Sequence, residues 1–464
     1  MTSTAAQLTT LEAFLQDYPT IKYIPPSSPE YPAARKPWNE ARLDNPLAVV
    51  KPQSPADVAA IVKHAKLNSL PFTIRSGGHN LEGRCVAQDA LLIDMRALTA
   101  VTIASDGKTA TVQGGILQDE LAGKLWEHGL ATPTGAVPTV GYVGWAMYGG
   151  YGPFSPHWGL GVDQILGATV VNPNGDIVKA DEVLLEGIRG AGGLFGVIID
   201  LTVKIYPLTS LLAGPIIYNP TDITKTYVDF NAAYERLLDS EGLPAQLSVQ
   251  QICFNGPMGR AFAALFLWSG ADIEEGKRWS EKIASLAPLM VNMVGPTTIP
   301  EWFVANGAMI PPTIAGTGFS HNVRRIPPPV AEAIGRNLAI MPADRGAMVS
   351  IHQLRGPSAG PQDHPSVFAT REPHYMLELL GFSTSGDEEE SRQWALQTAD
   401  ATQQADPDNV LSTAYISVYN SALQAKSTSD ALKKTYGPKA QVLRDLKATF
   451  DPDSVFSLTV PALE

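Results

Sequence analysis

The sequence predicts an α+β fold made of two parts, one of which is inserted into the other. Three observations lead to this expectation. The chain of 464 residues is too long for one ordinary core, and its 44% apolar content supplies a large interior. Short strands and glycine-rich turns dominate up to about Pro207, and longer helices alternate with apolar strands beyond it. We expect the first part over 1–210, the inserted part over 211–430, and a returning segment over 431–464.

The first part begins with a strand, helix, strand unit. A β-branched run at 48–50 precedes Ser54, a favourable N-cap that is followed by proline at the first helical position. Apolar residues then recur on one helical face, and a strand follows at 71–74. That strand runs into the loop 75–80, RSGGHN, whose paired glycines allow the backbone to approach a ligand closely.

A glycine-rich tract at 135–161 is the second unusual feature of the first part. It is too rich in glycine for a helix and too apolar for a solvent loop, so we expect it to wrap around something. The other elements expected in this part are strands at 90–94, 100–103, 109–113, 168–171 and 197–205, and a helix at 118–128.

The inserted part is expected to be an antiparallel sheet covered by helices. Its apolar strands are separated by longer segments with helical spacing. We expect strands at 247–254, 261–266, 347–354 and 374–382, and helices at 221–238, 273–286, 330–341 and 388–404.

Composition argues against several classes of partner. The chain has 34 basic and 46 acidic residues, a net charge of −12, so we expect no nucleic-acid partner and no anionic membrane partner. It has no long apolar run, and its first twenty residues lack the features of a secretory signal. The chain has two cysteines, Cys85 and Cys253, which are too few for a disulfide framework and too far apart in the sequence for a metal site. A single disulfide between them is the alternative. We expect a cytoplasmic protein without a bound metal.

The loop 75–80 has the groups of an anion-binding site. It offers consecutive backbone N–H groups, two glycines and one cation, which together suit a pyrophosphate. Taken alone, it is equally compatible with a simple turn at the end of a strand. The tract at 135–161 favours the ligand-binding interpretation, because so many small residues and so few charges suit a large flat molecule.

Five motifs in a fixed order carry a family resemblance: KPQSPADVAAIVKHA, TIRSGGHN, PTVGYVGWAMYGGYG, GLGVDQILGATVV and GGLFGVIIDLTVKIYP. This order resembles the FAD domain of the p-cresol methylhydroxylase (PCMH) and vanillyl-alcohol oxidase superfamily. PSVFATREPHY and YGPKAQVLRDLKATFDPDSVF resemble segments of its berberine-bridge-enzyme branch. The likeness is strong over about 40–210, with a PCMH-type core at about 40–208, and looser over about 345–460.

The resemblance implies a PCMH-type FAD-binding domain with an inserted substrate domain and the flavin at their interface. His79 matches the histidine that is joined to the 8-methyl carbon of the flavin, although a histidine beside non-covalent FAD is the alternative. Such a tether would raise the flavin potential and retain the cofactor. The resemblance implies that the pyrophosphate is bound by Arg75, Ser76, Gly77, Gly78 and Asn80. It implies that the flavin is lined by Thr139, Gly141, Gly144, Gly149, Gly150 and Gly152. Asp163 would lie just beyond the flavin, and Ile198 would lie against the adenine half.

The sequence departs from the family pattern at three places. Many relatives attach the flavin a second time through a cysteine before the proline, but Val137 offers no sulfur, so we expect one covalent link at most. Tyr148 replaces the first member of a glycine triplet, and Leu194 stands where asparagine is common. We expect both bulky side chains to narrow the cofactor pocket.

Tyr415 is the candidate catalytic base, because it matches the first tyrosine of a Y-x-N-Y segment in the family. If 413–418 form a strand, Tyr415, Ser417 and Tyr419 share one face and all three could meet the flavin. A phenol titrates near pH 10, so Arg371 is expected to help lower its pKa. The two tyrosines could equally be interior aromatic residues with satisfied hydroxyls. Weaker candidates for the pocket are His352 and Gln353, both expected to face the same cavity.

These features together predict an oxidase. It would take two electrons from a small organic substrate, plausibly a secondary metabolite, and pass them from FAD to O₂. A flavoprotein cyclase, with or without oxidation, and a dehydrogenase that uses another electron carrier stay open as alternatives. The expected partners are the substrate and O₂, and the chain would be a monomer or homodimer.

Overall fold

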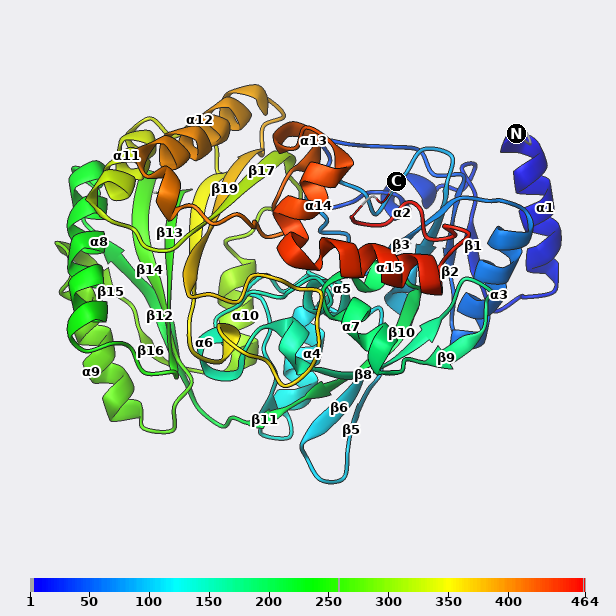
Figure 1. The fold of residues 1–464 in the computed structure, drawn as a ribbon, viewed down its shortest axis with the longest axis horizontal. Helices are drawn as coiled ribbons and strands as arrows, with labels where there is room; N and C mark the ends of the chain where they lie inside the picture. Colours follow the sequence, from blue (N-terminus) through cyan, green and yellow to red (C-terminus); the bar gives the residue numbers. More distant parts are fainter. Residues whose placement is uncertain (1–3, 258, 462, 464) are drawn as a thin grey trace.

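The chain forms two lobes, and the computed structural model describes residues 4–257, 259–461 and 463. One lobe holds the three smaller sheets, and the other is built on one large sheet (Figure 1). This mixed α+β architecture confirms the fold class predicted from the sequence. No helix in the described part of the chain is long and apolar enough to cross a membrane.

The first sheet of the first lobe has four strands in the order β1-β2-β4-β3. Two of its three strand contacts, β2 with β4 and β4 with β3, are parallel. Helix α3 connects β2 to β3 and begins as predicted, because Ser54 accepts a hydrogen bond from the Asp57 backbone. The bounds are β1 Lys22–Ile24, β2 Ala48–Lys51, α3 Pro55–Leu67, β3 Phe72–Arg75 and β4 Leu91–Asp94.

A five-stranded antiparallel sheet, β5-β6-β10-β8-β9, forms the second layer of this lobe. In the glycine-rich tract 135–161, two short helices, α5 and α6, interrupt the glycines. The expectation of a tract without helix was therefore wrong for these two turns. The bounds are β5 Val101–Ile103, β6 Thr109–Gln113, α4 Gln118–Trp126, α5 Tyr142–Ala146, α6 Ser155–Trp158, β8 Ile165–Val171, β9 Ile177–Lys179, α7 Glu182–Ala191 and β10 Val197–Lys204.

The second lobe is an eight-stranded sheet with the path β15-β12-β14-β13-β18-β19-β17 and β16 paired to β12. Helices α8, α9, α11 and α12 cover one face, where aromatic and aliphatic side chains form the largest core (Figure 1). The bounds are β12 Leu211–Tyr218, α8 Ile223–Ser240, β13 Leu247–Gly256, β14 Gly259–Trp268, α9 Ile273–Ala284, β15 Leu289–Asn292, β16 Gly295–Thr297, α10 Ile299–Gly307, β17 Ala315–Val323, α11 Pro328–Ala339, β18 Ala347–Leu354, β19 His374–Ser383 and α12 Glu389–Ala405.

All four helices and four strands expected in this lobe are present. Strand β17 was missed, because its sequence AGTGFSHNV contains glycines and polar residues that are typical of a loop. In the fold these polar side chains are buried between β19 and the segment around Thr413. Tertiary contacts therefore override the local propensity of this segment.

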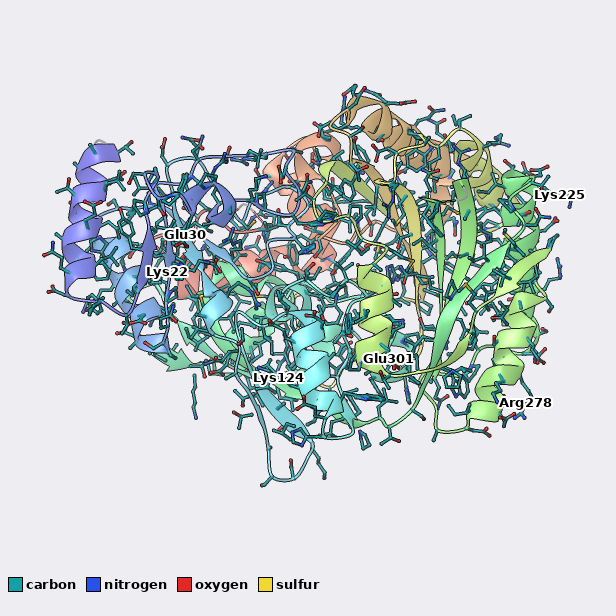
Figure 2. The ribbon with its side chains drawn as sticks, turned by 180° about the vertical axis from the view of Figure 1, so that it is seen from behind. Lys22, Glu30, Lys124, Lys225, Arg278 and Glu301 are labelled. Atoms are coloured by element: carbon teal, nitrogen blue, oxygen red, sulfur yellow. The ribbon has the colours of Figure 1, made fainter. Side chains whose placement is uncertain are left out.

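The charged residues of the helices point away from the sheet. Lys225 on α8 and Arg278 on α9 stand at the outer rim of the molecule (Figure 2). Each pairs with an acidic residue one turn away, Lys225 with Asp229 and Arg278 with Glu275. Such exposed pairs contribute little stability, so the buried apolar face holds the helices on the sheet.

The chain returns to the first lobe through α14 (Thr428–Tyr436) and α15 (Ala440–Phe450). The Tyr436 hydroxyl donates to the Gly190 carbonyl at 3.0 Å. The Lys447 ammonium donates to the Leu194 carbonyl at 2.9 Å and pairs with Asp451. These buried contacts fix the C-terminal segment against α7 and the turn that follows it.

Candidate active site

Two loops that are far apart in the sequence meet at the candidate site. A Cβ atom on Gly77 would lie 2.3 Å from the Thr139 carbonyl oxygen and 2.4 Å from the Gly141 nitrogen. A Cβ atom on Gly141 would lie 2.4 Å from the Ser76 hydroxyl oxygen. No real Cβ atom tolerates such distances, so glycine at both positions allows the loop 75–80 to pack against the start of the glycine tract.

His79 is held in a defined orientation between these loops. Its Nε2 lies 2.8 Å from the Thr139 hydroxyl, and its ring stacks on Trp38 with 4.8 Å between centroids. Burial lowers the pKa of His79 to about 4, so the imidazole is neutral at neutral pH. Among the described residues no hydrogen bond reaches Nδ1. A neutral, oriented imidazole with one free nitrogen is suited to bonding with an electrophilic carbon.

The remaining side chains of the loop have unequal roles. The Arg75 guanidinium pairs with Asp94 at 2.7 Å, which balances its charge. The Asn80 side chain accepts from the backbone of Glu82 and Arg84, which fixes the turn. The Ser76 hydroxyl is buried without a hydrogen-bond partner among the described residues. Anion binding here therefore depends on backbone N–H groups and Ser76 rather than on the Arg75 charge.

Most glycines of the tract are required by contacts within the protein. A Cβ atom would lie 2.6 Å from the Phe368 ring at Gly149, 2.8 Å from Gly161 at Gly150, and 2.0 Å from the Thr134 carbonyl at Gly152. Gly144 differs, because a Cβ atom there would meet open space. Contacts within the protein therefore account for most of these glycines, and Gly144 is the one that leaves space for a ligand. The orphaned Ser76 hydroxyl and the open Gly144 fit a bound FAD.

Asp163 and Arg371 form a bidentate ion pair between the lobes, with N–O distances of 2.8 and 3.1 Å. Burial raises the pKa of Asp163, and Arg371 opposes that effect. The expected role of Arg371 as a helper of Tyr415 is not supported, because its charge is used by Asp163. Ile198, assigned to the adenine side, is buried in the first lobe with its carbonyl oxygen against Gly114.

Tyr415 reaches the glycine tract from the segment that leaves the second lobe. Its hydroxyl oxygen accepts from the Gly150 N–H at 3.4 Å, and its ring lies 4.5 Å from that of Tyr151. Burial raises the pKa of Tyr415 to about 12, although the Ser417 hydroxyl and the Gly150 backbone lower it. The Tyr415 phenol is therefore protonated at neutral pH.

The expectation that 413–418 form a strand was wrong. The Tyr415 carbonyl accepts from the backbones of Val418 and Tyr419, so the chain turns here before Asn420 caps the next helix, α13 (Ser421–Gln424). Tyr419 consequently does not continue the face of Tyr415. Burial and the carboxylate of Asp430 on α14 both raise the pKa of Tyr419.

His352 and Gln353 lie on opposite faces of β18. The Gln353 side chain accepts from the Tyr234 hydroxyl of α8 at 2.8 Å, so it belongs to the face covered by helices. His352 is on the other face, with its ring edge-on to Tyr151 at 6.5 Å. The two side chains point to opposite faces because consecutive side chains of a strand alternate, although both residues line one small cavity beside Tyr151.

His352 belongs to a group of four polar residues on this face, together with Gln250, Ser350 and Glu378. We call this group the polar tetrad. Ser350 donates to the Glu378 carboxylate at 2.7 Å, and His352 Nε2 lies 3.4 Å from the same oxygen. Gln250 donates to the Ser350 hydroxyl at 3.0 Å. Burial raises the pKa of Glu378, but His352 and Ser350 bring it below its usual value, so the carboxyl is ionised at neutral pH.

The tetrad lies beside the tract of the first lobe. A cavity of about 10 Å³, large enough for one water molecule, is lined by residues that include Tyr151, Gly152, Gln250 and His352. Sequence reasoning missed Tyr151 and three members of the tetrad. Glu378 had a signal, since it is the one charged residue in the apolar strand HYMLELLGFS.

Tyr148 and Leu194 do not narrow the site. The Tyr148 hydroxyl donates to the Val460 carbonyl at 2.7 Å, and Leu194 is buried in the core of the first lobe. The Tyr148 side chain is bound to the C-terminal segment and the Leu194 side chain is part of the core. The expectation that they constrict the cofactor pocket is therefore not supported.

Comparison with known proteins agrees with this arrangement. Residues 46–181 match the FAD binding domain. FAD-linked oxidoreductase aurO of Gibberella zeae is 32% identical over 443 residues, which cover 94% of this chain and 85% of that protein. The solved structure of BBE-like 1 of Physcomitrella patens, 19% identical, has a TM-score of 0.81 and covers 98% of this chain and 99% of its own.

Glucooligosaccharide oxidase from Acremonium strictum has the same fold, with a TM-score of 0.82 at 19% identity, covering 98% of this chain and all of that chain. Its FAD is described as 6-S-cysteinyl, 8α-N1-histidyl. The chain has the same fold as the BBE-like protein of Physcomitrella patens. Because the match to the Gibberella zeae relative spans nearly the whole chain, this protein belongs to the FAD-linked oxidoreductases.

Proposed function

We propose that the protein is an FAD-dependent oxidase that acts on a small organic molecule of secondary metabolism, with O₂ as electron acceptor. The observation that carries the proposal is the contact between Tyr415 and Gly150, which brings a phenol of the returning segment against the glycine tract. The flavin would supply a two-electron acceptor for hydride from the substrate and return the electrons to O₂ as hydrogen peroxide.

We propose that FAD is held through the backbone of 75–80, the Ser76 hydroxyl and the open side of Gly144, and is bonded covalently to His79. The neutral imidazole and its free Nδ1 support the bond, because Nε2 is occupied by Thr139. The histidyl link described for the Acremonium strictum oxidase is consistent with it. A second link through sulfur is excluded in the 135–152 tract, because it contains no cysteine.

Tyr415 is proposed to handle the proton of the substrate. With a pKa of about 12 it is a phenol in the resting protein, so it can take the substrate proton only if its own proton passes to a base. The ionised Glu378 carboxylate, whose charge acts on Tyr415, is the proposed acceptor of that proton. Ser417 and the Gly150 N–H lower that pKa, which means that both stabilise the phenolate during the transfer. The apolar surroundings of Tyr151 and Phe368 limit access of water to this step.

The proposal is tested with the purified holoenzyme under anaerobic conditions. A panel of metabolites is screened for bleaching of the flavin band, and O₂ is then admitted while peroxide is measured. The proposal predicts bleaching followed by one peroxide per substrate consumed. Bleaching that O₂ does not reverse would indicate a dehydrogenase, and product without flavin reduction would indicate a cyclase; either result would contradict the oxidase.

A further inference from the structure

Trp38 is fixed by hydrogen bonds to both lobes. Its backbone N–H donates to the Gly78 carbonyl at 3.0 Å, in the loop that carries His79. Its indole N–H donates to the Pro311 carbonyl at 2.9 Å, and its own carbonyl accepts from the Ile314 N–H at 3.1 Å. Both of these partners precede β17 of the second lobe. The indole is therefore held at the interface from both sides.

Asn39, the next residue, anchors the same turn. It is buried, and its side-chain amide donates to the Leu81 carbonyl of the first lobe at 2.6 Å and to the Gly316 carbonyl of β17 at 2.8 Å. The Phe382 ring of β19 meets the Trp38 indole edge-on, with 5.8 Å between centroids. The indole cannot leave its place without breaking these contacts, so it provides a rigid surface.

One face of the His79 ring lies on that surface. The two rings are 4.8 Å apart between centroids and nearly parallel, with 22° between their planes. The stack sets the plane of the imidazole, and the contact of Nε2 with the Thr139 hydroxyl at 2.8 Å sets its rotation within that plane. When Nε2 carries the proton and donates it to Thr139, the lone pair of the neutral ring lies on Nδ1, in a fixed direction.

A bond to Nδ1 places positive charge on a ring whose surroundings disfavour it. Burial lowers the pKa of His79 to about 4, and no carboxylate opposes that effect in the described part of the chain. The electron-rich face of an aromatic ring attracts a cation within about 6 Å of its centroid, and tryptophan does so best. Trp38 lies within that distance, so its indole can stabilise the charge as it develops.

We propose that Trp38 is a positioning residue for the attachment of FAD: it presents His79 Nδ1 to the 8-methyl carbon and stabilises the positive charge that the imidazole gains. This inference rests on the bond between His79 and FAD proposed above. Trp38 acts through His79, so its loss should slow bond formation while FAD still binds.

The step balances in atoms and electrons. Bond formation joins Nδ1 of His79 to the 8-methyl carbon, while one proton leaves that carbon and one leaves Nε2. The two electrons released stay in the flavin until O₂ accepts them, together with two protons, as hydrogen peroxide.

The test follows attachment in the full chain, synthesised without flavin and then given FAD. Covalent flavin is measured by its fluorescence on the denatured polypeptide, and total bound flavin by absorbance after gel filtration. In Trp38→Leu the aromatic face is lost, so we expect attachment to be about tenfold slower or more, with the affinity for FAD changed less than about threefold. Trp38→Phe keeps an aromatic face and should restore much of the rate.

Trp279→Leu is the matched control, because it removes a mostly buried tryptophan of α9 from the core of the second lobe. It should attach FAD at the wild-type rate. Equal rates in the wild type and Trp38→Leu would overturn the proposal. It would also fall if Trp38→Leu lost FAD binding altogether, or if Trp38→Phe were as slow as Trp38→Leu, because Trp38 would then serve only the packing of the site.

The outcomes separate this inference from the proposed oxidase. A wild type that binds FAD and never bonds it would refute the tether and with it the role of Trp38, while peroxide formation by the bound flavin would leave the oxidase standing. If the wild type attaches FAD, Trp38→Leu attaches it slowly and no metabolite is oxidised, the oxidase fails and the role of Trp38 stands.

Discussion

Removing only the hydroxyl of Tyr415 separates proton transfer from packing. In Tyr415→Phe the ring contact with Tyr151 stays, and the lost bond to the Gly150 N–H is long, at 3.4 Å. A weak hydrogen bond contributes at most about 1 kcal/mol, so the free energy of unfolding should fall by no more than that. Loss of a group that transfers the substrate proton slows the chemical step by about 10²–10⁴-fold. The rate of flavin reduction should therefore drop at least about a hundredfold at unchanged flavin content.

The assay is single-turnover flavin reduction by stopped flow, once a substrate has been found in the bleaching screen. Tyr436→Phe is the matched control, because it removes a buried hydroxyl that donates to Gly190 and lies in the C-terminal segment. The control should lose similar stability, about 1 kcal/mol, and keep the wild-type rate. If Tyr415→Phe slows flavin reduction only a fewfold, Tyr415 lines the pocket without transferring the substrate proton, and the reasoning is refuted.

Four further predictions follow from the same contacts. His79→Ala should release FAD into the supernatant when the protein is denatured, and flavin that stays with the variant polypeptide would contradict the tether. Mass spectrometry of a tryptic digest should find FAD on one peptide only, because Val137 offers no sulfur; a flavin that bridges two peptides would disprove this. Gly77→Ala should lower the flavin to protein ratio, since its Cβ would lie 2.3 Å from a carbonyl oxygen, and Gly123→Ala, with open space, should not. Burial lowers the pKa of His374 from 6.5 to about 4, so the folded state excludes a proton that the unfolded chain binds. This contribution to stability is present above pH 6.5, is lost as the pH falls towards 4, and should amount to about 3 kcal/mol. Urea unfolding of His374→Gln should depend less on pH over that window than the wild type, and an unchanged dependence would refute the assignment.

Local features of the sequence were sufficient for many of the elements but not for the meeting of the two loops. Ser54 and the apolar spacing after it predict α3, because capping and helix periodicity are local. The contact between His79 and Thr139 could be expected only through the family resemblance, since the two residues are 60 positions apart. Only the structure shows that the Nδ1 atom of His79 has no hydrogen bond to the described residues.

The polar tetrad shows where sequence reasoning ends. Ser350 and Glu378 are directly opposite each other on β18 and β19, and that register follows from the pairing of two distant strands. Strand alternation alone would have separated His352 from Gln353. The turn at Tyr415 was hidden for another reason, because a β-branched, aromatic stretch favours a strand until tertiary contacts and the Asn420 cap bend it.

The central claim, that FAD lies between the loop 75–80 and the glycine tract and is bonded to His79, is tested most directly by one absorbance measurement. The spectrum of the purified protein is recorded before and after acid precipitation and washing. The account predicts a yellow protein whose flavin band stays with the washed precipitate. A yellow supernatant over a colourless precipitate would contradict the covalent bond, and a protein that is colourless and takes up no FAD would contradict the site itself.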